Sequence, residues 1–346
     1  MAYFRTVPRL PDLLALFSKS ERWLIAVNAD PDALASAMAL KRIMAHRVLD
    51  VKIAHINDIH RPDNLEMIQS LRIPLRKLTP NVSAQFDRFA LVDSQPHHSE
   101  ILAKLPFSVV IDHHPPSDEH PVEAEFTDIQ PDYGANSTLL TEYLYNLNIR
   151  PGKLLATALA YGIKTDTDSF ERIFCDADIR AFQWLNKYAS HLLLRKIYRS
   201  EFHLEWLKHF CGAYYKMRLL GRGLFAYLVN VESPDILVIL ADIFLRVQGQ
   251  SWVVIAGVVD DKLVAIFRGD GLRRDMGKFS ARILAGVGSA GGHKTMARGE
   301  APLSAIGDQD PELFLFERLQ KDKRPCRKSA KNGDAAAKPD PSGGDE

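Results

Sequence analysis

The chain has 346 residues and a formal net charge of +1, with 46% hydrophobic and 25% charged residues. This length predicts two domains. The balanced charge excludes a protein-wide field that attracts polyanions, so nucleic-acid binding would need a local patch. There is no apolar run of about 18 residues, and residues 1–11 lack the pattern of a secretory signal, so we expect a cytoplasmic protein with no membrane partner. Cys175, Cys211 and Cys326 are widely spaced, which excludes a Cys-rich zinc site and is typical of a reducing compartment.

The first part of the chain, residues 1–175, alternates short apolar strands with helical patterns and is expected to form one domain. We expect strands at residues 23–27, 51–56, 90–93 and 109–112, and helices at residues 33–46, 135–147 and 153–163. Continuous apolar strands separated by helices predict a mostly parallel sheet that is covered on both faces.

The second part of the chain is expected to be smaller and to follow a helical connector at residues 176–218, where apolar and aromatic side chains recur at helical spacing. An α/β C-terminal domain is expected over residues 219–319. Its expected elements are strands at 225–229, 251–259 and 262–268, helices at 275–284 and 310–319, and a glycine-rich loop at 286–293. The composition of residues 320–346 cannot bury a core and predicts a disordered tail. The predicted fold class is therefore α/β.

Acidic residues recur at the expected strand ends of the first domain: Asp30 with Asp32, Asp93, Asp112 and Asp166. In parallel sheets, ligands bind at the carboxyl ends of the strands. A single Asp at such a place would be explained as a helix N-cap. Four such clusters in one chain instead predict a dinuclear metal site for phosphoester chemistry, in which two ions roughly 3.5–4 Å apart clamp a phosphate.

The chemistry of the side chains indicates how the ligands could be divided between two ions. Asp30 and Asp32 flank a proline and could serve one ion each, and Asp93 could bridge both. His113 and Asp166 could complete the second ion. Hard oxygen and imidazole ligands suit Mn²⁺ or Mg²⁺.

Five short stretches, taken in order, resemble the motifs of the DHH phosphoesterases. Residues 28–36 (NADPDALAS) resemble the first motif, residues 91–93 (LVD) the second, residues 111–114 (IDHH) the third and residues 162–167 (GIKTDT) the fourth. Residues 291–293 (GGH) are similar to the glycine-rich histidine motif of the DHH-associated C-terminal domain. The branch with this layout includes RecJ-like exonucleases, nanoRNases and cyclic dinucleotide phosphodiesterases.

The resemblance implies roles for individual residues. The implied ligands of two Mn²⁺ ions are Asp30, Asp32, Asp93, His113 and Asp166. The implied catalytic residues are Asp112, His113 and His114, and the implied substrate contacts are His114, Arg268, Gly291, Gly292 and His293. We therefore expect a metal-dependent phosphodiesterase that hydrolyses short oligonucleotides, or cyclic or linear dinucleotides, by metal-activated water in a cleft between the two lobes. Whether the protein forms a homodimer stays open.

One position departs from the family pattern. The first motif normally has a metal-binding His four residues before its first Asp, and Ala26 stands there in this chain. Asn28 could offer a weak amide oxygen, and His97 or His98 could also reach the site. The alternative function is therefore a nucleotide-binding or regulatory protein with weakened catalysis. A third option is a pyrophosphatase-type activity on a small substrate.

Overall fold

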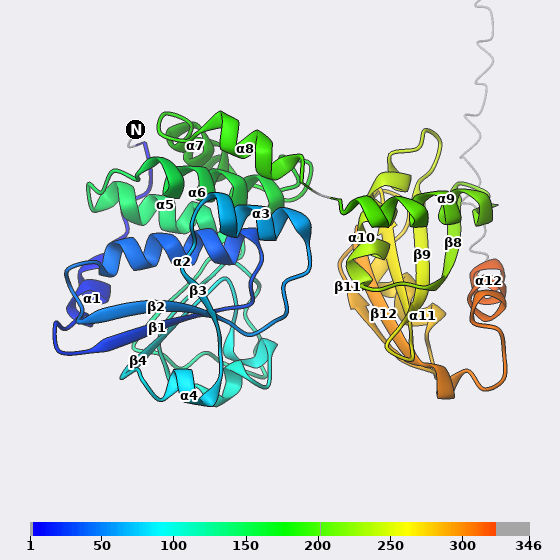
Figure 1. Ribbon diagram of the computed structural model, residues 1–346, viewed down its shortest axis with the longest axis horizontal. Helices are drawn as coiled ribbons and strands as arrows, with labels where there is room; N and C mark the ends of the chain where they lie inside the picture. The colour runs from blue at the N-terminus through cyan, green and yellow to red at the C-terminus, as the bar shows by residue number, and fades with distance from the viewer. Residues whose placement is uncertain (1–2, 201, 323–346) are drawn as a thin grey trace, which may run out of the picture. The chain divides into compact units, whose positions relative to one another are not determined.

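The computed structural model describes residues 3–200 and 202–322. The chain divides into two compact units, unit 1 (residues 1–207) and unit 2 (residues 208–346), which Figure 1 shows in blue to green and in green to red. The tail expected at residues 320–346 lies outside the described residues from residue 323 onward.

Unit 1 is built on a parallel sheet, with its described strands in the order β3-β2-β1-β4-β5-β6. The strands are β1 (Arg22–Val27), β2 (Asp50–His55), β3 (Leu75–Lys77), β4 (Arg88–Val92), β5 (Phe107–Asp112) and β6 (Phe126–Ile129). The predicted α/β class is confirmed, and the four expected strands end within two residues of their predicted bounds.

The side chains of β1 alternate between the two faces of the sheet. Ile25 and Val27 pack into the main core, whereas Leu24 and Ala26 pack into a smaller apolar cluster. Figure 1 shows α2, α5 and α6 together on one face of the sheet. The helices of unit 1 are α1 (Leu10–Ala15), α2 (Pro31–Met44), α3 (Pro62–Ser70), α4 (Pro80–Ser83), α5 (Asn136–Asn146), α6 (Lys153–Asp166), α7 (Asp176–Leu185) and α8 (His191–Tyr198).

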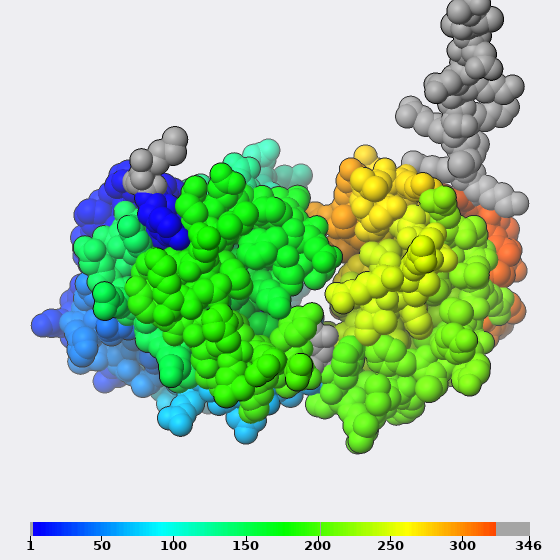
Figure 2. Space-filling model, turned by 90° about the horizontal axis from the view of Figure 1, so that it is seen from above, coloured from blue at the N-terminus to red at the C-terminus, as the bar shows by residue number. Residues whose placement is uncertain are grey.

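The segment at residues 176–218 is largely helical, and its helices divide between the two units. Helices α7 and α8 contribute Ala181, Trp184 and Ile197 to the core of unit 1. Helix α9 (Leu207–Lys216) begins at the boundary and lies almost entirely in unit 2. In the space-filling view, the green surface of unit 1 comes from its helical second half (Figure 2).

Unit 2 contains a mixed sheet with its described strands in the order β11-β12-β10-β9-β8-β7. Helix α10 connects β8 to β9, which allows these two strands to run parallel, whereas the other described pairs are antiparallel. The strands are β7 (Arg218–Leu220), β8 (Gly223–Asn230), β9 (Trp252–Val259), β10 (Lys262–Gly269), β11 (Ser289–Gly292) and β12 (Met296–Pro302). The helices after α9 are α10 (Pro234–Leu245), α11 (Met276–Ile283) and α12 (Pro311–Lys321).

The tight turn expected between β9 and β10 is present. Asp260 and Asp261 adopt φ angles of 46° and 59°, and the two strands pair directly on either side of them. A two-residue turn with both φ angles positive matches the twist of the flanking strands. Behind this hairpin, Phe267 and Trp252 pack against Phe279 of α11 in the core of unit 2.

Two local predictions are wrong. Asp166 does not follow a strand, because helix α6 continues past the expected end at residue 163 and Asp166 is its last residue. The glycine-rich segment at residues 286–293 is not a loop throughout, because Ser289–Gly292 forms the edge strand β11 and pairs with β12. None of the described helices combines the length and apolarity needed to cross a membrane.

Candidate metal centre

The first motif places two aspartates around the start of α2. Asp30 has extended backbone and is the N-cap, with its Oδ1 accepting a hydrogen bond from the Ala33 backbone N–H at 2.9 Å. Pro31 follows at the first position of the helix, where its missing N–H costs nothing. Asp30 therefore has the N-cap role that a lone Asp would have, while its charge still lies close enough to raise the pKa of Asp93.

Asp32 is fully buried and is held by the start of another helix. Its two carboxylate oxygens accept hydrogen bonds from the backbone N–H groups of Asn136 (2.6 Å) and Ser137 (2.8 Å), at the first turn of α5. The positive end of the α5 dipole favours the anionic carboxylate there. Helix α6 approaches closely on the other side, because Gly162 leaves the space in which a Cβ would lie 2.9 Å from Asp32 Oδ1.

Asp93 and His113 lie just past the ends of β4 and β5. Asp93 is buried and adopts a φ angle of 59°, an uncommon conformation for a residue other than Gly. The His113 Nδ1 lies 3.0 Å from the Tyr133 carbonyl oxygen, which leaves Nε2 to face the acidic residues. This Nε2 lies 3.3 Å from Asp93 Oδ1 and 3.2 Å from Asp166 Oδ2.

Four side chains come together from four separate elements. Ligand atoms of Asp32, Asp93, His113 and Asp166 all lie within 4.8 Å of one another, and those of Asp93, His113 and His114 form a second such group. Asp93 Oδ1 and His113 Nε2 are buried, and although they lie 3.3 Å apart, neither makes a hydrogen bond of good geometry. Buried polar atoms are normally satisfied, so unsatisfied atoms at the centre of a ligand cluster fit a bound cation.

The pKa values of the cluster also fit a bound cation. Burial, together with repulsion from neighbouring carboxylates, raises the pKa values of Asp30 and Asp32 to about 6. Burial also raises the pKa of Asp166, and it raises that of Asp93 well above its ordinary value. Burial opposes the charged form of His113, but the Asp166 and Asp93 carboxylates outweigh it and raise the His113 pKa to about 12. A divalent cation would supply the positive charge that the carboxylates lack.

His114 has its own support next to this cluster. Its Nδ1 lies 2.8 Å from Oδ1 of the fully buried Asp112, while the His114 side chain is 43% exposed. Gln95 donates from Nε2 to the other Asp112 oxygen at 2.9 Å. Burial raises the pKa of Asp112, but the hydrogen bonds from His114 and Gln95 outweigh it and leave the pKa below its ordinary value. Asp112 in turn holds the pKa of His114 above its ordinary value, against the effect of burial.

The position of the missing family histidine is apolar. Ala26 is fully buried in a cluster with Leu24, Ala54 and Leu91. Strand alternation would point the side chain of Asn28 the same way as that of Ala26, but Asn28 is exposed. The His98 ring lies 5.6 Å from that of His114, and His98 Nδ1 is within 3.2 Å of the Gln95 N–H and the Ser94 hydroxyl. His98 therefore neighbours His114 and is not one of the grouped ligands.

The expected substrate contacts of unit 2 lie at one end of its sheet. Arg268 of β10 pairs through Nε with Asp242 of α10 at 2.5 Å, and its side chain is 12% exposed. Gly291 and Gly292 are the last residues of β11, and His293 begins the exposed turn to β12. The His293 carbonyl oxygen accepts from Gly277 at the start of α11, so this turn also caps that helix.

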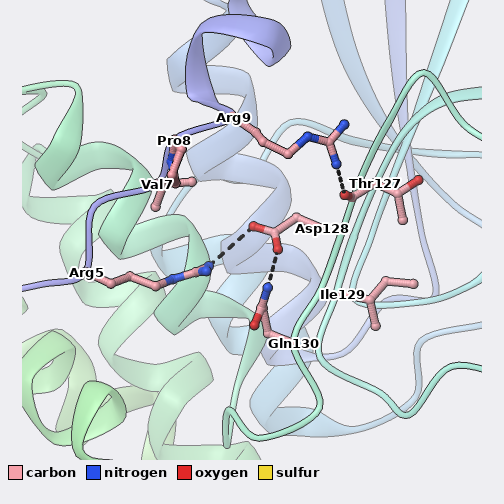
Figure 3. Close-up of a pocket in the computed structure, with 8 residues that line it drawn as sticks. All are labelled: Arg5, Val7, Pro8, Arg9, Thr127, Asp128, Ile129 and Gln130. Carbon is pink, nitrogen blue, oxygen red and sulfur yellow. Dashed lines mark hydrogen bonds and ion pairs between the residues drawn. The ribbon is translucent and has the colours of Figure 1, made fainter.

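A separate pocket lies behind the sheet edge, between the N-terminal segment and β6 (Figure 3). Arg5 forms ion pairs with Asp128 and Glu142, and Arg9 donates to the Thr127 carbonyl oxygen at 2.9 Å. Because both guanidinium groups already have partners, we interpret this pocket as a structural contact that holds the N-terminal segment against β6.

Three supporting groups were not predicted. Gln95 is fully buried and hydrogen-bonds to Asp112. The Tyr133 carbonyl and the first N–H groups of α5 likewise orient His113 and Asp32. These are contacts between distant segments, and neither residue type nor spacing reveals them.

Comparisons with known proteins relate this chain to a family, a relative and a solved structure. Residues 24–163 match the model of the DHH family, N-terminal domain. An uncharacterized protein of Methanocaldococcus jannaschii is 32% identical over 299 residues, which cover 85% of this chain and 61% of that protein. The chain thus spans about three fifths of the length of this relative. An exopolyphosphatase-related protein from Bacteroides fragilis has a similar fold, with a TM-score of 0.70, 17% identity, and coverage of 90% of this chain and 94% of that one.

The match to the family model defines the class of domain that carries the acidic cluster. Residues 24–163 of unit 1 form a DHH family N-terminal domain.

Proposed function

We propose that this protein is a metal-dependent phosphodiesterase that hydrolyses short oligonucleotides or cyclic or linear dinucleotides. The observation that carries the proposal is the group of Asp32, Asp93, His113 and Asp166, which offers four ligand atoms within 4.8 Å of one another. Substrate class is the part of the proposal that rests on the sequence resemblance and not on this geometry.

The donor set fits divalent ions with hard ligands. Three carboxylates and one imidazole suit Mn²⁺, and Asp93 and His113 belong to both ligand groups. We propose two Mn²⁺ ions, with Asp32, Asp93, His113 and Asp166 as ligands and with Asp30 contributing charge beside them. Such ions, when bound, would neutralise the phosphate and lower the pKa of the attacking water.

The remaining chemistry is assigned to residues of the chain. Asp112 and Gln95 orient His114, and its exposed imidazole is placed to give a proton to the leaving oxygen. The raised pKa of His114 supports this role, since a general acid must carry its proton near neutral pH.

Unit 2 is proposed to hold the substrate through His293, Gly291 and Gly292. The turn that follows β11 is exposed, and the loop after β10 lies beside it, because Gly269 donates to the Thr295 carbonyl oxygen at 2.8 Å. The exposed basic residues on these two segments and on α11 are Arg273, Lys278, Arg282 and Lys294. A substrate with more than one phosphate would suit such a surface.

The test is hydrolysis of a phosphoester panel with Mn²⁺: di- to pentanucleotides, cyclic dinucleotides and inorganic pyrophosphate. We expect mononucleotide release by the parent and by Asp12→Asn, an exposed surface control. Asp93→Asn should lose at least about 100-fold in hydrolytic activity. Removal of a group that only supports a metal ligand already lowers metal affinity or activity about 10–100-fold.

Each other outcome has a definite meaning. Cleavage of pyrophosphate alone would replace the proposal with the pyrophosphatase-type activity. Nucleotide binding without any hydrolysis would favour a regulatory protein whose first metal site was lost at Ala26. Hydrolysis that survives Asp93→Asn unchanged would refute the proposed site.

A further inference from the structure

The loop at residues 167–175 joins the candidate ligand Asp166 to helix α7, and its backbone is strained. Asp168, Ser169 and Phe170 have consecutive φ angles of 48°, 59° and 69°. Left-handed conformations are unfavourable for residues with a Cβ, and they persist only where the surrounding structure enforces them. Three consecutive residues with positive φ, one of them aromatic, therefore indicate that the surrounding structure holds this loop in its conformation.

Local contacts hold this loop in place. Ser169 N–H donates to the Lys164 carbonyl at 2.7 Å, and Arg172 N–H donates to the Thr167 carbonyl at 2.9 Å. The Phe170 ring packs edge-on against Phe182 of α7 at 5.5 Å. The strained segment is thus a fixed turn anchored to the end of α6 and to the core.

This turn presents two apolar side chains to solvent. Phe174 is 40% exposed and rests with an edge-to-face contact on Phe170, with ring centroids 5.5 Å apart. Ile173 is 83% exposed. Neither side chain is needed to complete the core, so strain and packing together hold an aromatic platform at the surface.

The loop adjoins the metal centre at more than one point. It begins at the residue after Asp166, and a Cβ on Gly134 would lie 2.7 Å from Thr167 Cγ2 and 2.9 Å from the Ile173 carbonyl oxygen. Gly134 follows Tyr133, whose carbonyl oxygen binds His113. The loop therefore packs on the segment that orients a candidate ligand.

We infer that this loop is the base-recognition rim of the site, in which Phe174 stacks on a nucleobase of the substrate and Ile173 borders it. The inference rests on the proposed function and deepens it: the substrate carries a base and is not a bare polyphosphate. Base stacking on aromatic side chains tolerates any base, because every base offers a π-face. Phe174 is a specificity residue in this account and takes no part in the chemical step.

The test combines substitutions at residue 174 with removal of the bases from the substrate, in the manner of a double-mutant cycle. Hydrolysis of a 5′-phosphorylated diadenosine and of its analogue with both bases removed is measured with Mn²⁺ for the parent, Phe174→Ala and Phe174→Tyr. Leu192→Ala, an exposed apolar residue of α8, is the control. Binding of a 2-aminopurine dinucleotide with Ca²⁺ in place of Mn²⁺ reports stacking directly through fluorescence quenching.

We expect Phe174→Ala to lower kcat/KM for the normal dinucleotide about tenfold and to leave the abasic analogue unchanged. Phe174→Tyr and Leu192→Ala should retain parent activity, and quenching should be lost only in Phe174→Ala. Equal losses on both substrates, or unchanged quenching in Phe174→Ala, would overturn the inference while leaving the phosphodiesterase intact. Quenching that depends on Phe174 without any hydrolysis would instead refute the proposed function and keep the base contact. If the dinucleotide is neither hydrolysed nor bound, both ideas fall.

Discussion

Asp30 and Asp32 belong to one short motif and yet have different chemical surroundings. Asp30 uses an oxygen to cap its own helix, whereas both oxygens of Asp32 receive N–H groups from the start of α5. The N–H groups stabilise the charged form of Asp32 and aim it at the cluster. Residue type predicted two acidic ligands, and the fold shows that Asp32 belongs to the group of four clustered ligand atoms, whereas Asp30 caps its own helix.

A prediction at this scale concerns Asp112. Asp112→Asn keeps the size of the buried side chain but removes the carboxylate that accepts from both His114 and Gln95. We expect kcat to fall on the order of 100-fold with little change in KM or in Mn²⁺ affinity. Loss of the carboxylate also lowers the pKa of His114, so the pH limb that needs protonated His114 should move to lower pH. A pH–rate profile measures the effect.

Two further variants test whether Asp112 acts by positioning His114 or supports the protein structure independently. His114→Ala combined with Asp112→Asn should be no slower than His114→Ala alone, because Asp112 acts through His114. Additive losses, or a pH limb that stays in place, would contradict the assigned role.

At the scale of elements, the meeting of α2, α5 and α6 fixes the geometry of the site. Replacing Gly162 of α6 by Ala would normally favour a helix by about 1 kcal/mol. Here the new Cβ would lie 2.5 Å from Ser137 Oγ and 2.9 Å from Asp32 Oδ1. We expect Gly162→Ala to lower the free energy of unfolding by about 1–3 kcal/mol and to weaken Mn²⁺ binding, as measured by thermal denaturation and metal titration.

Gly152→Ala, at the N-cap of the same helix, is the control, because its Cβ would meet nothing within 4 Å. It should leave both stability and metal binding near those of the parent. A stabilised Gly162→Ala protein with full metal affinity would show that α6 does not approach Asp32 as closely as described.

The sequence predicted most of the strands that bury long apolar runs, but it missed the apolar helix α10 and several marginal elements. Strand β5 is buried at every position, and its pattern was unambiguous. Strands β3 and β6 have only three and four residues, and most of their side chains are partly exposed, so no periodicity marks them. Asp166 was expected at a strand end, yet helix α6 brings it to the cluster.

At the scale of the whole molecule, sequence order indicated which side chains gather but not what supports them. Parallel strands bring their carboxyl ends to one edge, which made Asp93 and His113 predictable neighbours. The contact of Asp32 with Asn136 spans 104 positions and that of Gln95 with Asp112 spans 17. Contacts across such separations follow from the packed fold and have no local signature.

The central claim is that the buried acidic cluster binds Mn²⁺. At pH 7 the metal-free His113, with its pKa raised to about 12, carries a proton on the nitrogen that faces the carboxylates. An imidazole must be neutral to ligate a metal, so binding must release this proton, and affinity should rise with pH.

Calorimetric titration with Mn²⁺ in two buffers of different ionisation enthalpy tests this claim most directly, for the parent, Asp93→Asn and Asp12→Asn. We predict binding by the parent and by Asp12→Asn with release of about one proton or more, and loss of binding in Asp93→Asn. Binding without proton release, or equal affinity in Asp93→Asn, would contradict the account.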